Sequence, residues 1–285
     1  MKTIFHITTK ESWNLALSSG SYKSEGGFIH CSLPHQILGI ANFLFKQAND
    51  LLLLNIDQEL LESEVKYEGD DEDKFPHVYG NIELDAVVSV HDFFQVNGVF
   101  VFPENFELIA QTLIRPAVMS DAAEITNVNL NAWKESYVGI ISDKTLRDRH
   151  LYFARGVRGK KQSMKDKNNF GIVAETHLHG IVGISLGGKS RDIGPGNELY
   201  EHLGEICAFY LLEKYKGLGI GKKLLIHSLS ALKKLGFNSA YCWVLCKNPT
   251  LQFYEHNGAK KTNHIKTCKI GEQELLEESM VWSQI

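Results

Sequence analysis

The spacing of apolar residues predicts a regular order of elements in the second half of the chain. Residues 204–212 (GEICAFYLL) form a continuous apolar run, which is typical of a buried strand. A glycine-rich segment follows, and residues 220–235 then repeat apolar residues at helical spacing up to Gly236, a residue type that often stops a helix. Residues 240–245 form a second apolar strand, and Asn248 with Pro249 predicts the start of a short helix.

The first hundred residues follow a different pattern, in which short strands outnumber helices. One helix is predicted from a capping box formed by Thr8 and Glu11, and another from a Ser-Pro start at Ser32. Strands are predicted at IFHIT, GGFIHCS, LLLLNID, VYGNIEL and AVVSVHDF. Residues 1–105 are therefore expected to form an α+β domain of ordinary size.

Charge divides the chain at nearly the same place. Residues 1–111 contain six lysines, no arginine and 17 acidic residues, a net charge of −11, whereas the remaining 24 basic and 17 acidic residues give +7. Such a change in composition is typical of a domain boundary. We therefore expect a first domain at residues 1–105, a linker at residues 106–111 and a second domain at residues 112–285.

The composition disfavours several classes of protein. No segment approaches the roughly 18 apolar residues that span a bilayer, and the N-terminus lacks the apolar core of a signal peptide, so we expect a cytoplasmic protein without a membrane partner. Five cysteines without a CxxC pair predict neither a disulfide framework nor a metal site. The acidic run EGDDEDK at residues 68–74 is most simply a solvated loop, and its charge argues against nucleic-acid binding.

The glycine-rich segment at residues 213–225 (EKYKGLGIGKKLL) carries the clearest chemical signal. Its glycines alternate, so they fit neither a P-loop nor a dinucleotide-binding fingerprint. Between a strand end and a helix start, however, glycines let backbone N–H groups converge on an anion such as a pyrophosphate, and lysines add positive charge. The alternative is a tight turn with a solvated basic face. The predicted anion contacts are Lys216, Gly217, Gly219, Gly221 and Lys222.

The order of strand, glycine loop, helix, strand and short helix resembles the GNAT acetyltransferase superfamily. Residues 216–221 (KGLGIG) match the family's Arg/Gln-x-x-Gly-x-Gly/Ala pattern, with lysine in place of the usual first residue. Residues 132–140 (AWKESYVGI) resemble a Trp-x-x-x-Tyr-x-Gly-Ile segment found after the first helix in many members, and FGIVAE and GIVGISLGG resemble the central hairpin. The resemblance covers most of residues 112–285 and implies an α/β acyltransferase domain with a mixed, splayed sheet that binds acetyl-CoA.

The resemblance also implies catalytic roles. Glu205 matches the position of a carboxylate that removes the amine proton through a water, with Glu201 and His202 as reserves. Tyr254 matches the general acid for the leaving thiolate, because a phenol with a pKa of about 10 is protonated at neutral pH. The structural alternatives are an ordinary strand-end carboxylate and a packed tyrosine.

Other contacts implied by the family lie on its strands and first helix. Its fourth and fifth strands separate, so that unpaired backbone groups meet the pantetheine amides and a backbone N–H holds the oxyanion. The implied coenzyme contacts in this region are Phe209, Leu211 and Asn248, and the implied substrate contacts are Trp133, Tyr137 and Glu201.

The first domain resembles a second family. EGGFIHCS at residues 25–32 and KFPHVYG at residues 74–80 resemble the bacterial domain of unknown function 952, which is distantly similar to the ADP-ribosyltransferase fold. That family supplies no established activity. His6, His30 and His77 stand at its motif positions, and they are expected either to line a pocket or to be satisfied structural histidines.

These observations lead to one main hypothesis and two alternatives. We expect a two-domain enzyme that uses acetyl-CoA to acetylate an amine of a small molecule or a protein. Carboxylates at Glu198, Glu201 and Glu205 favour a cationic amine. One alternative is a CoA-binding sensor without catalysis, and the other is an NAD-using transferase in the first domain, which the lack of arginine there disfavours.

Overall fold

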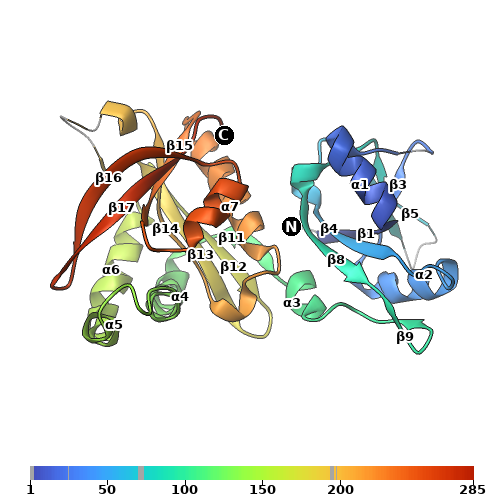
Figure 1. The fold of residues 1–285 in the computed structure, drawn as a ribbon, viewed down its shortest axis with the longest axis horizontal. Coiled ribbons are helices and arrows are strands. Elements are labelled where there is room, and N and C mark those ends of the chain that lie inside the picture. The colour runs from blue at the N-terminus through green and yellow to red at the C-terminus, as the bar shows by residue number, and fades with distance from the viewer. Residues whose placement is uncertain (1–2, 25, 70–73, 193–195, 197) are drawn as a thin grey trace. The chain divides into compact units, whose positions relative to one another are not determined.

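The chain forms two compact units, Met1–Gln111 and Thr112–Ile285, which Figure 1 draws as ribbons. The computed structural model describes residues 3–24, 26–69, 74–192, 196 and 198–285, so residues 70–73 of the acidic run lie outside the described part of the chain. None of the described helices combines the length and the apolar character that crossing a membrane requires.

The first unit contains two three-stranded antiparallel sheets, with strand orders β1-β4-β8 and β3-β6-β5. Every residue of the central strand β4 is buried, which explains why its sequence LLLLNID is almost continuously apolar. The remaining described strands of this unit form two short pairs, β2-β7 and β9-β10. The expected similarity of this unit to ADP-ribosyltransferases stays a prediction. The elements are β1 (Thr3–Thr9), α1 (Lys10–Ser19), β2 (Ser21–Tyr22), β3 (Ile29–His30), α2 (Ile37–Leu44), β4 (Leu51–Asp57), β5 (Glu64–Glu68), β6 (Phe75–Tyr79), β7 (Ile82–Glu83), β8 (Val87–Phe93), β9 (Gln95–Val96), β10 (Val99–Phe100) and α3 (Phe106–Ala110).

The N-cap of α1 is Thr9, so the capping box predicted at Thr8 is wrong by one residue. The side-chain oxygen of Thr9 accepts a hydrogen bond from the N–H of Ser12 at 3.1 Å. Thr8 still belongs to β1, and its hydroxyl bonds to the hydroxyl of Tyr22 at 2.7 Å. The strand therefore continues one residue further than the capping pattern indicated.

The segment expected as a linker, residues 106–111, forms helix α3 within the first unit. Phe106 and Ile109 are buried, and the ring of Phe106 lies 5.1 Å from the ring of Phe5 between centroids. These contacts add α3 to the first core. The polar turn that suggested a linker instead precedes a helix with a buried apolar side.

The second unit is a seven-stranded sheet with the order β11-β12-β13-β14-β15-β17-β16. Strands β14 and β15 are parallel and the other neighbours are antiparallel, so the sheet is mixed, as expected. Its elements are β11 (Leu113–Pro116), α4 (Ala122–Ser136), α5 (Asp143–Asp148), α6 (Phe153–Ser163), β12 (Asn169–Thr176), β13 (Gly180–Lys189), β14 (Gly204–Leu211), α7 (Ile220–Lys234), β15 (Ala240–Leu245), α8 (Thr250–His256), β16 (Lys260–Ile270) and β17 (Gln273–Trp282).

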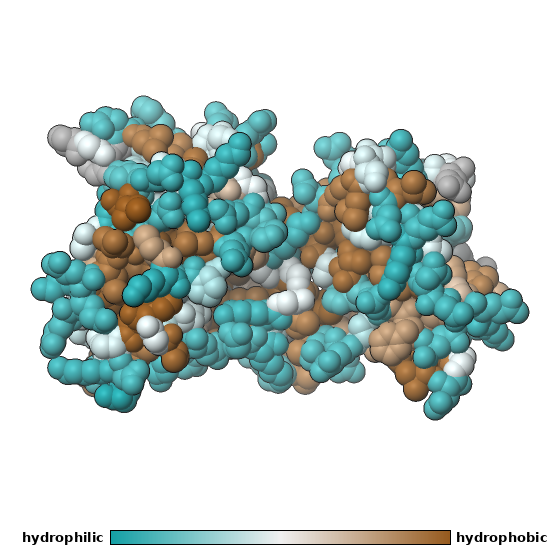
Figure 2. Space-filling model, in the orientation of Figure 1, coloured by the Kyte–Doolittle hydropathy of each residue, from teal (hydrophilic) through white to brown (hydrophobic). Residues whose placement is uncertain are grey.

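Helices α4 and α7 cover opposite faces of this sheet. Ile125 of α4 packs in one core with Ala208, and Leu225 of α7 packs in another with Phe209. Successive residues of a strand point to opposite faces, so the two cores are separated by the sheet. Apolar side chains also reach the surface, where they form brown areas among the hydrophilic ones in Figure 2.

Candidate active site

Strands β14 and β15 pair over two residues only and then separate. The pairing ends at Glu205 of β14 and Tyr241 of β15. On its other edge β14 pairs with β13, with an irregularity at which Cys207 has no opposite residue. Such a β-bulge bends a strand and increases its twist. Beyond Glu205, the edge of β14 that faced β15 is therefore open to the backbone-like amides of a ligand.

The glycine loop after β14 leads into the N-terminus of α7. Gly217 and Gly219 have φ values of +75° and +79°, which residues with a side chain rarely adopt. The first hydrogen bond of α7 runs from the N–H of Lys223 to the carbonyl of Gly219 at 3.1 Å. The N–H groups of Ile220 and Gly221 therefore have no acceptor inside the helix and lie at the positive end of its dipole. This arrangement suits a pyrophosphate.

Side chains around the loop indicate that backbone groups would hold such an anion. A Cβ added at Gly221 would lie 3.4 Å from the ring of Phe253, which is an ordinary van der Waals contact. Lys216 forms an ion pair with Glu213 at 2.6 Å, and Lys222 is partly buried. The residues present thus fit the pyrophosphate of acetyl-CoA, mainly through N–H donors.

Tyr254 lies on α8 with only 5 % of its surface exposed. Its ring meets that of Phe209 edge-on, with 6.0 Å between centroids, and that of Trp282 at 5.7 Å. Burial raises the pKa of its phenol well above the ordinary value, and the nearby phenols of Tyr137 and Tyr210 act in the same direction. The hydroxyl is therefore protonated at neutral pH, as a general acid requires.

Asn248 orders the turn between β15 and α8. Its Oδ1 accepts hydrogen bonds from the N–H and the hydroxyl of Thr250 at 2.9 and 2.7 Å. The helix itself begins at Thr250 with Pro249 as N-cap, so Asn248 supplies the capping oxygen from one residue further out than predicted. Asn248 thereby positions the helix that carries Tyr254, and a direct contact with the coenzyme stays a prediction.

Aromatic side chains from α4 and β14 gather where the two strands have separated. Nε1 of Trp133 donates to the hydroxyl of Tyr210 at 2.8 Å, and the ring of Tyr137 packs edge-on against Trp133 at 4.8 Å. The sequence did not indicate the neighbouring Arg149, whose guanidinium lies 3.4 Å from the centre of the Trp133 ring. The buried Nε of Arg149 has no hydrogen-bond partner among the described residues. An unsatisfied cationic donor therefore stands beside two of the predicted substrate contacts.

Glu205 is almost fully buried, and Arg191 binds its carboxylate. The backbone N–H and Nε of Arg191 donate to Oε2 at 3.0 and 2.9 Å, and Nη2 donates to Oε1. The side chain of Arg191 is 69 % exposed, so it can leave the carboxylate without disrupting the core. Glu205 lies at the point where β14 and β15 separate, and its role as the base stays a prediction.

A polar cluster that the sequence did not reveal lies next to this ion pair. Oδ2 of Asp192 accepts from Nε1 of Trp243 at 2.7 Å and from the hydroxyl of Tyr241 at 3.0 Å, and Oδ1 accepts from Nζ of Lys266 at 2.8 Å. Although burial opposes the shift, these hydrogen bonds keep the pKa of Asp192 below its ordinary value. The one signal in the sequence was the spacing of Tyr241 and Trp243, which places two polar aromatic tips on the same face of β15.

The remaining predicted contacts are placed as follows. Phe209 and Leu211 lie on the open part of β14, where Phe209 stacks on Phe253 at 5.7 Å and Leu211 is buried. Their backbone groups, rather than their side chains, are therefore the candidates for ligand contacts. Glu201 is exposed in the turn before β14.

The predicted histidines of the first unit lie close together. Nδ1 of His30 is 3.1 Å from Nε2 of His77, and Nδ1 of His6 donates to the carbonyl of His30 at 2.7 Å. All three line one pocket. The structure therefore brings the three histidines together at one pocket, and a role for them there stays a prediction.

Comparison with known families agrees with this geometry. Residues 130–259 match the acetyltransferase (GNAT) family, and residues 7–90 match a family described as a protein of unknown function (DUF952). Over these residues the second unit is therefore similar to acetyltransferases of the GNAT family, and the first unit is similar to the DUF952 family.

Individual relatives match one unit or the other. The chain is similar to the uncharacterized N-acetyltransferase YuaI of Bacillus subtilis (strain 168), with 29 % identity over 142 residues that cover 50 % of this chain and 76 % of that protein. Protein CC0527 from Caulobacter crescentus is 26 % identical, with a TM-score of 0.33, over 35 % of this chain and 94 % of that one. The PaiA N-acetyltransferase from Thermoplasma acidophilum, solved in complex with coenzyme A, is 21 % identical with a TM-score of 0.43, over 59 % of this chain and 97 % of that one.

Proposed function

We propose that the chain transfers an acetyl group from acetyl-CoA to a primary amine at the opening between β14 and β15. The observation that carries the proposal is the position of Tyr254, a buried and protonated phenol packed against the open strand. The same strand leads directly into a glycine loop that suits a pyrophosphate. The candidates for coenzyme binding and for proton donation thus both adjoin β14.

Acetyl-CoA, when bound, supplies the acetyl group as a thioester. The N–H groups of Ile220 and Gly221 would hold its pyrophosphate, and the open edge of β14 would orient its amides. Tyr254 keeps a proton on its hydroxyl oxygen for the developing thiolate. An alkylamine with a pKa of about 10.4 has to lose a proton before it can attack. We assign that proton to Glu205, through a water, after Arg191 has moved.

Replacing Glu205 with glutamine is expected to lower kcat by about 10²-fold, because an amide cannot accept the proton. Rates at saturating acetyl-CoA would measure the effect. Asp192→Asn is the matched control, since it neutralises the neighbouring carboxylate with polar partners. An unchanged kcat together with a lower melting temperature would show that the Glu205–Arg191 pair is structural.

The pairing of charges near the opening indicates which acceptors fit. Glu205 is held by Arg191 and Asp192 by Lys266, so neither carboxylate is free to bind a second ammonium. Nε of Arg149 lacks a partner among the described residues. We therefore propose an acceptor with a carboxylate near its amine, rather than the cationic amine that the sequence favoured.

The test is an assay of the full chain with acetyl-CoA and pairs of primary amines that differ only in a carboxylate. Release of free thiol and mass spectrometry of the products are the readouts. Arg149→Gln is expected to raise KM about tenfold for the carboxylate-bearing amines alone, which is the effect of losing one charge-assisted hydrogen bond. Arg147→Gln, a substitution of an exposed arginine on α5, is the control. An equal change for both members of each pair would exclude this role of Arg149.

A CoA-binding sensor without catalysis is the second candidate, because Arg191 occupies both oxygens of Glu205. Tight binding of acetyl-CoA, with no free thiol and no acetylated product from any amine, would favour the sensor and contradict the proposed transfer.

A further inference from the structure

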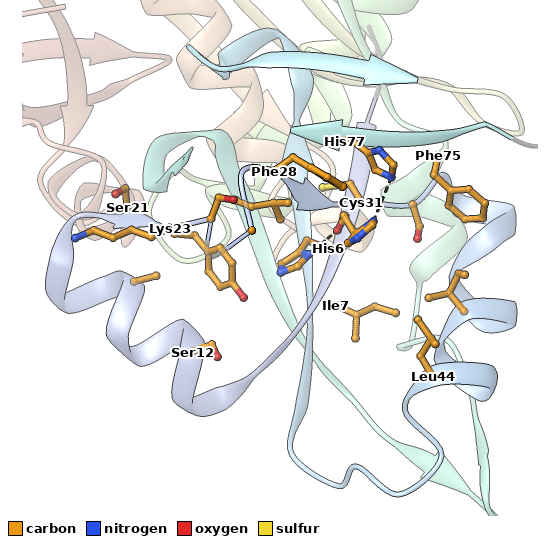
Figure 3. Close-up of a pocket in the computed structure, with 18 of the residues that line it drawn as sticks. His6, Ile7, Ser12, Ser21, Lys23, Phe28, Cys31, Leu44, Phe75 and His77 are labelled. Atoms are coloured by element: carbon orange, nitrogen blue, oxygen red, sulfur yellow. Dashed lines mark hydrogen bonds between the residues drawn. The ribbon is translucent and has the colours of Figure 1, made fainter. Parts of the chain in front are cut away.

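A pocket of about 870 Å³ lies entirely within the first unit. Figure 3 shows that α1 supplies Ser12 and α2 supplies Leu44 on opposite sides of it, while His6 and His77 come from strands. Pockets of this size hold small organic molecules. The function proposed above assigns no role to this pocket.

Three neighbouring strands, β3, β6 and β5, carry a chain of polar side chains at its wall. Oε2 of Glu68 accepts from the hydroxyl of Tyr79 and lies 2.8 Å from Nδ1 of His77. Nε2 of His77 lies 3.1 Å from Nδ1 of His30. The strand register that pairs His30 directly with His77 creates this contact. Glu68, His77 and His30 therefore form a continuous relay.

The relay determines which nitrogen of each neutral ring carries the proton. A carboxylate only accepts hydrogen bonds, so Nδ1 of His77 donates to Glu68 and Nε2 of His77 is left as an acceptor. Nδ1 of His30 must then be the donor to His77. Burial and the proximity of His77 lower the pKa of His30, so this ring is neutral at neutral pH. Its Nε2 carries a lone pair to which no described residue donates.

His6 fixes His30 from the other side. Nδ1 of His6 donates to the carbonyl of His30 at 2.7 Å, and burial lowers the pKa of His6 to about 4, so this ring is also neutral. The buried Nε2 of His6 has no hydrogen-bond partner in the described part of the chain. His6 is thus a positioning residue that holds the backbone at His30.

The rest of the wall indicates an uncharged, flat ligand. Phe28 packs against His77 at 4.6 Å and stacks on Tyr79 at 5.3 Å between ring centroids, which provides an aromatic surface. Among the described residues of the lining, Lys23 and Glu68 are the charged ones apart from the histidines, and Glu68 is engaged in the relay. One lysine is a poor match for a pyrophosphate. Within the described part of the chain, no group of three or more His, Cys, Asp or Glu side chains could hold a metal ion.

We propose that this pocket is a second ligand site, for a small uncharged aromatic compound with a hydroxyl or N–H group. Nε2 of His30 accepts the hydrogen bond of that group, and Glu68 keeps His30 in the accepting tautomer through His77. The aromatic wall formed by Phe28 holds the ring of the ligand.

The test compares two probes that differ only in the donor, 2-naphthol and 2-methoxynaphthalene, with calorimetry on the full chain. 2-Naphthol is expected to bind about tenfold more tightly, the effect of one net hydrogen bond. In His30→Phe the two probes should bind alike, and Glu68→Gln, which keeps the shape of the relay, should reduce the difference. His91→Gln, a substitution on β8 outside the pocket lining, should leave it unchanged.

Several outcomes would overturn the proposal. The first is equal affinity for the two probes, and the second is no binding of 2-naphthol at all. The third is a difference in affinity between the probes that persists in both His30→Phe and Glu68→Gln when these variants are folded. Tighter binding of 2-naphthyl phosphate or NAD than of 2-naphthol would show that the pocket takes anions instead.

Discussion

Gly219→Val is expected to weaken binding of acetyl-CoA by about 10²–10³-fold, because two hydrogen bonds from backbone N–H groups to a charged oxygen would be lost. Gly219 is the N-cap of α7 and has φ of +79°, a conformation that valine adopts only with strain. The backbone would shift, and the N–H groups that follow would no longer converge on one point. Isothermal titration calorimetry with acetyl-CoA measures the effect.

Gly236 provides the control for this experiment, since it lies just beyond the other end of the same helix. Its φ is +95°, and a Cβ added there would meet nothing within 4 Å. Gly236→Val therefore introduces a comparable backbone strain without touching the glycine loop. If both variants lost affinity to the same extent, or if neither did, the loop would not be the pyrophosphate site.

Tyr254→Phe is expected to lower kcat by about 10²–10⁴-fold while the affinity for acetyl-CoA changes little, because a general acid acts mainly in the transition state. The substitution removes one hydroxyl and keeps the ring that packs on Phe209 and Trp282. Steady-state rates and calorimetry on the same preparation separate the two quantities.

Tyr200→Phe is a suitable control, because it removes another buried phenol from the same unit. The hydroxyl of Tyr200 donates to Ser279 at 2.7 Å and contacts His264 at 2.9 Å. Its loss should lower stability without a comparable loss of kcat. If Tyr254→Phe kept the full kcat, Tyr254 would have a packing role and no role as the general acid.

The elements around the candidate site could be predicted because their signals are local. Strand β15 coincides with the apolar run at residues 240–245, and α7 ends before Gly236, whose positive φ explains the glycine. The alternating glycines indicated a backbone anion site, and Gly217 and Gly219 do adopt the left-handed conformation that only glycine favours. In each case the relevant neighbours are a few residues apart.

The partners of the catalytic candidates could not be predicted, because they depend on how distant segments fold back. Arg191 follows β13 and reaches Glu205, 14 residues later, only because β13 and β14 form an antiparallel pair. The position of Arg149 could not be predicted for the same reason. Its guanidinium lies over the ring of Trp133, and its Nε lacks a partner among the described residues, only because two separate segments pack together.

The cap of α1 shows a smaller failure of the same kind. Thr8 and Thr9 are both good cap residues, and the sequence alone does not choose between them. The register of β1 determines which threonine is the cap. Thr9 still pairs with Leu51 of β4, so the helix can begin only after Thr9.

Helix α3 determines where the two domains can be separated. A fragment that ended at residue 105 would lose Phe106 and Ile109 from the first core. Removing a single buried phenylalanine side chain typically costs roughly 3–5 kcal/mol, a large part of the stability of a small domain. A recombinant fragment should therefore extend to Gln111. By the same reasoning, a gene fusion or fission that exchanged the second unit would have to leave this helix with the first unit.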